Sequence, residues 1–122
     1  MPKFLKNLQQ KGIIHVYSSK NNTLITLTDL QGNTKLWTSA GTLGFKNSRK
    51  STTYAAQTAA DDLATRALIL GFCSVIVKIK GLGYGKDSTV RALYKSKLVI
   101  TKLIEQTPIS HNGCRPPKKR RI

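Results

Sequence analysis

Near the end of the chain, His111 and Cys114 lie close together, and these residue types can hold a metal ion or form a nucleophile with its general base. Structural zinc takes four ligands, and the remaining candidates, His15 and Cys73, fall in segments with strand chemistry. A Cys–His nucleophile also needs an orienting third group on an ordered scaffold, which a proline-rich basic segment does not supply. We therefore expect no metal site, no cofactor and no enzymatic activity.

Three glycines and a lysine in KGLGYGK (80–86) form a second candidate site. A glycine-rich turn between a strand and a helix can bind a phosphate through its backbone N–H groups. The Walker pattern requires four residues between its first glycine and the Gly-Lys pair, whereas only three separate Gly81 from Gly85. It also requires Ser or Thr after the lysine, and Asp87 follows Lys86. We expect the turn either to bind a phosphate of RNA or to be no more than a tight turn between the strand and the helix. A phosphate-loop nucleotide-binding protein using Gly81 to Lys86 is an alternative.

A basic loop, TLGFKNSRKS (42–51), precedes the longest predicted helix. Lys46, Arg49 and Lys50 lie just before a helix N-terminus that is itself electropositive, so they oppose the helix dipole. A bound anion would remove this conflict, and a solvated charged loop is the simpler alternative. Phe45 could stack on a base or anchor the packing of the loop.

The charge balance indicates the class of partner. The chain of 122 residues carries 21 Lys and Arg against 5 Asp and Glu, a net charge of +16. A compact domain with this charge repels itself, so a polyanion would stabilise it, with nucleic acid ahead of a membrane surface. No apolar run approaches the roughly 20 residues of a membrane span. With nucleic acid as the leading candidate, we expect no membrane partner. The terminal PPKKRR could track a phosphate backbone, or it could address a DNA-binding module to the nucleus.

The elements that must position these loops follow from periodicity. Alternating β-branched and apolar residues predict strands, and alanines and leucines repeating at three and four predict a helix. The predicted elements are strands 13–19, 22–30 and 34–41, a helix 52–71 capped by Ser51 or Thr52 and stopped by Gly71, a strand 73–81, a helix 87–97 capped by Asp87 or Ser88, and a strand 98–107. The first three strands form a predicted antiparallel meander.

This order of elements predicts an α/β domain over residues 13–107, with a mixed five-stranded sheet and two main helices packed on it. A short N-terminal arm, 1–12, precedes the domain. An extended basic tail, 108–122, follows it, because periodicity stops at Pro108 and the tail has too little apolar surface to fold alone.

The chain contains, in order, SSKNNTLITLTDLQGN, SAGTLGFKNSRKSTTYAAQTAA, KGLGYGK and TPISHNGCRPPKKRRI. From about Gly12 to the end, these segments resemble the universal eleventh protein family of the small ribosomal subunit. The resemblance implies a ribonuclease H-like fold without catalytic carboxylates. It also implies a structural role in the platform of the subunit, bound to rRNA near the mRNA exit region and beside neighbouring platform proteins.

The resemblance places rRNA contacts in the first turn, the basic loop, the glycine turn and the tail, which coincide with the basic and glycine-rich segments described above. Matched onto this chain, they are Asn21, Asn22, Thr23, Gly44, Phe45, Lys46, Arg49, Lys50, Ser51, Gly83, Gly85, Lys86, Arg91, His111, Asn112, Gly113, Cys114, Arg115, Lys118, Lys119, Arg120 and Arg121. The family's usual proline-containing glycine turn reads GLGYG here, and the long basic N-terminal arm is nearly absent. These departures look like a mitochondrial member, with plastids and bacterial cytoplasm as alternatives.

Overall fold

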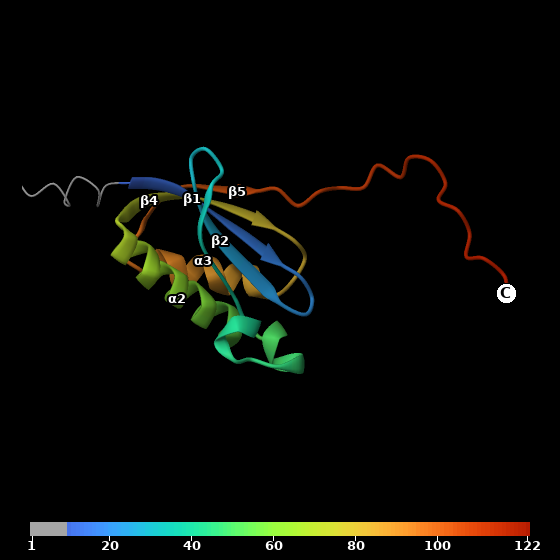
Figure 1. Cartoon of the computed structure of the whole chain (residues 1–122), viewed down its shortest axis with the longest axis horizontal. Coiled ribbons are helices and arrows are strands. Elements are labelled where there is room, and N and C mark those ends of the chain that lie inside the picture. The colour runs from blue at the N-terminus through green and yellow to red at the C-terminus, as the bar shows by residue number, and fades with distance from the viewer. Residues whose placement is uncertain (1–9) are drawn as a thin grey trace, which may run out of the picture.

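The computed structural model describes residues 10–122, and Figure 1 shows their arrangement. The elements in chain order are β1 (Gln10–Ser18), β2 (Thr23–Asp29), β3 (Thr34–Ser39), the 3-10 helices η1 (Gly41–Leu43) and η2 (Asn47–Ser51), α2 (Thr53–Leu70), β4 (Phe72–Lys80), α3 (Gly85–Lys95) and β5 (Val99–Glu105). The N-terminal arm expected over 1–12 lies outside the described residues up to residue 9, and residues 10–12 belong to β1. None of the helices in residues 10–122 combines the length and the hydropathy that a membrane-spanning helix needs.

The five strands form one sheet in the order β3-β2-β1-β4-β5. β1 pairs with β2, and β2 with β3, in antiparallel fashion, whereas β4 runs parallel to both β1 and β5. The prediction of an α/β domain with a mixed five-stranded sheet and two main helices is therefore confirmed. The crossover through α2 carries the chain from the edge strand β3 past the central β1 to β4.

One face of the sheet forms the core together with the two helices, which lie on the same side of it in Figure 1. The alternation predicted for β4 holds, because Val75 and Val77 are buried towards the helices while Lys78 is not. α2 presents alanines to the core, and their small side chains let the helix lie close to its neighbours. The opposite face of the sheet carries no helix of the described chain.

The ends of α2 follow from capping. The Thr52 hydroxyl accepts a hydrogen bond from the amide of Ala55 at 3.2 Å, and Gly71 adopts a left-handed φ of 101° at the other end. Both features match the sequence prediction. The predicted start of the second helix is wrong: α3 begins at Gly85 rather than at Asp87, and no side chain caps it. Asp87 instead lies in its first turn, where a carboxylate favours the helix dipole.

Candidate nucleic-acid interface

The predicted site segments converge at one end of the sheet. The parallel strands β1, β4 and β5 all have their carboxyl ends there, and β3 ends there too because it runs antiparallel to β2. The amino ends of α2 and α3 lie at the same end (Figure 1). We call the three connections at this end, residues 19–22, 40–52 and 81–84, together with Gly85 and Lys86 at the start of α3, the loop end. The tail also leaves β5 here.

The glycine turn is packed tightly against the first turn. The amide of Gly83 donates to the carbonyl of Ser18 at 2.9 Å. A Cβ on Gly83 would overlap the Ser19 carbonyl, and one on Gly81, whose φ is +110°, would overlap that of Ser18. A Cβ on Gly85 would overlap the Thr23 hydroxyl. The glycines therefore let two turns that are distant in sequence lie against each other.

This packing uses N–H groups that a phosphate would need. The Gly83 amide is taken by Ser18, and the Gly81 amide donates to the Thr107 hydroxyl at 3.2 Å. Lys86, the lysine of the Walker-like pattern, forms an ion pair with Glu105 at 3.3 Å. The geometry therefore disfavours the nucleotide-binding alternative.

Hydrogen bonds within the first turn fix its shape. The Ser19 amide donates to the Asn22 carbonyl at 2.9 Å, and the Asn22 side-chain oxygen accepts from the Thr23 amide at 2.8 Å. Asn21 is exposed, whereas Thr23 is only 2% exposed and faces Gly85. Asn21 can therefore reach a ligand, while the side chain of Thr23 positions the turn.

The basic loop presents its cations to solvent. Lys46 and Arg49 are exposed, Lys50 is half-buried, and none of them forms an ion pair within the described residues. Phe45 packs edge-to-face on Tyr54, with ring centroids 6.0 Å apart and an interplanar angle of 78°. Phe45 thus anchors the loop to the first turn of α2. The cations remain available to an anion.

Two other predicted residues of this loop play local roles. Gly44 adopts a φ of 92° and ends η1. The Ser51 hydroxyl donates to the Ser48 carbonyl at 2.7 Å, within η2. Both shape the loop that carries the cations.

The tail begins against the glycine turn, because the Gln106 amide donates to the Ile79 carbonyl at 2.7 Å and Thr107 accepts from Gly81. Residues 108–122 contain no helix or strand, and every one of them is exposed. The predicted contacts in the tail are His111, Asn112, Gly113, Cys114, Arg115, Lys118, Lys119, Arg120 and Arg121. The start of the tail adjoins the loop end, so these cations can extend its positive surface.

Arg91 is not brought to the loop end. It lies on the exposed side of α3, about 9 Å along the helix from Gly85 at 1.5 Å per residue. An RNA contact there would require a ligand that extends along α3.

Comparison with known proteins decides the family. The sequence model of the family described as ribosomal protein S11 matches residues 12–121. This chain belongs to the ribosomal protein S11 family. It is 64% identical over 114 residues to "Small ribosomal subunit protein uS11m" of Prototheca wickerhamii, covering 93% of this chain and 89% of that protein. The protein of the same name in Marchantia polymorpha is 59% identical over 105 residues, covering 86% of this chain and 84% of that relative.

Bacterial members of the S11 family are also similar. "Small ribosomal subunit protein uS11" of Francisella tularensis subsp. novicida is 50% identical over 120 residues, covering 98% of this chain and 93% of the relative. The resemblance inferred from the four sequence segments is thus confirmed, and the chain is a small-subunit ribosomal protein by family.

Sequence reasoning missed two residues that the structure places at the candidate interface of this S11-family chain. Glu105 places a carboxylate beside Lys86, and Tyr54, 67% exposed, supports Phe45. An aromatic residue in the first turn of a helix that follows a basic loop was the available signal for Tyr54. Glu105 gave no local signal, because its contact with Lys86 depends on how β5 aligns with β4.

Proposed function

We propose that this S11-family protein is a structural constituent of the small ribosomal subunit of mitochondria, and that its loop end and tail bind rRNA. One observation carries the proposal: segments far apart in sequence present their cations at one end of the fold. The loop end and the strand end beside it carry Lys20, Lys46, Arg49, Lys50, Lys80 and Lys86. The tail adds Arg115, Lys118, Lys119, Arg120 and Arg121. Two acids border this surface: Glu105, which forms an ion pair with Lys86, and Asp87, which lies in the first turn of α3.

The interface suits a folded RNA better than a duplex read by its bases. Its cations stand on turns of fixed shape, held by the glycine packing and by the Phe45–Tyr54 contact. Such an arrangement recognises the backbone and the shape of an RNA surface. The exposed tail can follow a phosphate backbone away from the domain. Catalysis has no part in this function.

We place the protein in the platform of the subunit, near the mRNA exit region and beside other platform proteins, as the family resemblance implies. The mitochondrial assignment is supported by the identities of 64% and 59% to relatives named uS11m, which exceed the 50% to a bacterial uS11. Plastid and bacterial ribosomes are the alternatives.

Binding of the full chain to a folded platform-domain rRNA fragment, compared with a scrambled RNA of equal length, tests this function. We expect tight binding to the folded fragment only, weakened when residues 108–122 are removed. With about eight phosphates neutralised, the slope of log K against log salt should be about −6 to −7.

A slope near −2, or equal affinity for the two RNAs, would contradict the proposal. Preference for duplex DNA at matched salt would favour the nuclear DNA-binding alternative. Binding of ATP that Lys86→Ala abolishes would favour the nucleotide-binding alternative.

A further inference from the structure

The sheet face opposite the two helices forms a second surface. We define the open face as the side of the sheet that carries His15, Tyr17, Leu24, Trp37, Lys78 and Lys80. Strand pairing places these residues together, because Tyr17 lies between Leu24 and Lys80, and His15 lies between Thr26 and Lys78. Tyr17, Leu24 and Trp37 are 45%, 42% and 58% exposed, which is unusual for large apolar side chains grouped on one face.

The open face is positively charged. Lys80 lies 5.9 Å from the centroid of the Tyr17 ring, and Lys78 stands beside His15. Burial, and then the charge of Lys78, lower the pKa of His15, so this imidazole is neutral near pH 7. The five acids of the chain lie elsewhere. Asp61 and Asp62 are on α2, and Asp87 is on α3. Asp29 and Glu105 stand opposite Gly12 and Ile79 on the neighbouring strands, so they belong to the side of the sheet that faces the core. The face therefore complements a polyanion.

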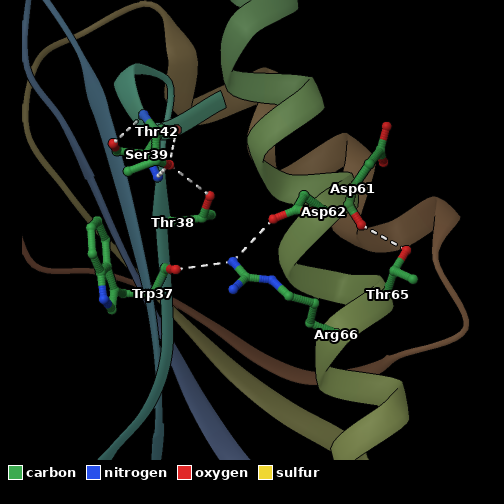
Figure 2. Close-up of polar contacts among 8 residues, drawn as sticks. All are labelled: Trp37, Thr38, Ser39, Thr42, Asp61, Asp62, Thr65 and Arg66. Atoms are coloured by element: carbon green, nitrogen blue, oxygen red, sulfur yellow. Dashed lines mark hydrogen bonds and ion pairs between the residues drawn. The ribbon is translucent and has the colours of Figure 1, made fainter. Parts of the chain in front are cut away.

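Trp37 is held in place from the opposite side of its strand. The Arg66 guanidinium donates to the Trp37 carbonyl at 3.0 Å and is itself paired with Asp62 at 3.0 Å. Figure 2 shows Arg66 reaching from α2 to this carbonyl while the indole points away from the helix. Tyr17 lies two strands across and two residues along from Trp37, about 12 Å away by strand spacing. The two rings can therefore contact different bases.

We propose that the open face binds an unpaired RNA segment, with bases stacked on Trp37 and Tyr17 and phosphates bound by Lys78 and Lys80. Exposed aromatic rings beside cations are the means by which sheets bind single strands without reading their sequence. Protein interfaces, in contrast, are depleted in lysine. The inference rests on the proposed function, because Lys80 adjoins Gly81 of the loop end, so RNA bound there can continue onto the open face.

The chain has one tryptophan, so Trp37 fluorescence reports on the open face alone. We would titrate the full chain with a short unpaired oligouridine and expect the fluorescence to be quenched as a base stacks on the indole. Labelled oligouridine would then measure the affinity of Trp37→Leu and Tyr17→Leu, which keep the face apolar. Each variant should weaken binding at least about fivefold, since stacking is worth about 1–3 kcal/mol per base. Tyr94→Leu, which removes a 59% exposed ring from α3, should change nothing.

The folded platform-domain fragment separates the two proposals. Tight binding of that fragment, without quenching of Trp37 by oligouridine, would overturn the open-face proposal and leave the loop end intact. Loss of oligouridine affinity in Tyr94→Leu equal to that in Trp37→Leu would also overturn it. If the leucine variants instead bind oligouridine normally but lose a ribosomal protein from reconstituted subunits, the open face binds protein and the proposal is wrong. Failure of the wild-type chain to bind the fragment would refute the function of the loop end.

Discussion

Replacing Gly83 with alanine tests whether the glycine turn serves packing rather than phosphate binding. The added Cβ would overlap the Ser19 carbonyl oxygen and the Ser18 hydroxyl and would lie 2.8 Å from the Ser19 carbonyl carbon. Relief of this overlap requires the turn to move away from Ser18, which breaks the 2.9 Å hydrogen bond from the Gly83 amide. Overpacking costs about 1–3 kcal/mol, and the lost hydrogen bond about 1 kcal/mol. We expect the free energy of unfolding to fall by about 2–4 kcal/mol.

Urea denaturation followed by circular dichroism would measure this loss, at one fixed salt concentration that screens the net charge of +16. Two glycines serve as controls. Gly113→Ala meets no atom within 4 Å and should leave the stability unchanged. Gly44→Ala also meets none, but its φ of +92° should cost about 1 kcal/mol. A Gly83→Ala protein as stable as Gly113→Ala would refute the packing argument, and loss of RNA binding without loss of stability would assign the glycine to the ligand.

Other contacts give further predictions. The hydrogen bond from the Asn33 backbone amide is the largest cause that lowers the pKa of Asp29 from 3.8. Ionised Asp29 therefore stabilises the fold fully above pH 3.8, and this stabilisation is lost as the pH falls through the lowered pKa. Asp29→Asn should remove this pH-dependent part of the free energy of unfolding measured in urea. Lys86→Gln should weaken rRNA-fragment binding and Glu105→Gln should strengthen it in filter-binding assays, with stability changes below about 1 kcal/mol because the pair is exposed. Arg66→Met should cost about 1–2 kcal/mol in urea denaturation, because the β3 edge loses its donor.

The two faces of the sheet could be predicted from the sequence because side chains alternate along a strand. Ile25 and Leu27 are buried on one face, as expected, while Thr26 lies on the other. The bounds of α2 were also predictable, since Thr52 and Gly71 act through local backbone geometry. Each of these features depends on residues close together in the chain.

The start of α3 could not be predicted from capping residues alone. Asp87 and Ser88 are good caps, but the packing of Gly85 against Thr23 and Ala56 orients the chain so that the helix begins two residues earlier. Thr89 then donates to the Gly85 carbonyl at 2.8 Å within the helix. Tertiary contact overrode the local preference here.

The cationic segments could be found one at a time from the sequence, but their convergence could not. It requires β1 to pair in parallel with β4, whose residues lie about sixty positions away in the chain, and local periodicity does not encode that pairing. The same pairing buries Thr23 against Gly85, although both were expected to contact RNA. Sequence reasoning therefore located the cationic segments more readily than it separated the exposed side chains within them from the buried ones.

The most direct test of the central claim compares the salt dependence of rRNA-fragment binding for two triple variants. The first carries Lys46→Gln, Arg49→Gln and Lys50→Gln in the loop end. The second carries Lys11→Gln, Lys95→Gln and Lys97→Gln at the opposite end of the fold, and both lower the net charge from +16 to +13. For the loop-end variant, the slope of log K against log salt should be less negative than that of the wild type by about 2, since each lost phosphate contact removes about 0.7–0.9. For the variant at the opposite end, the slope should equal that of the wild type. Equal changes in both would contradict an interface at the loop end and would mean that the RNA responds to net charge alone.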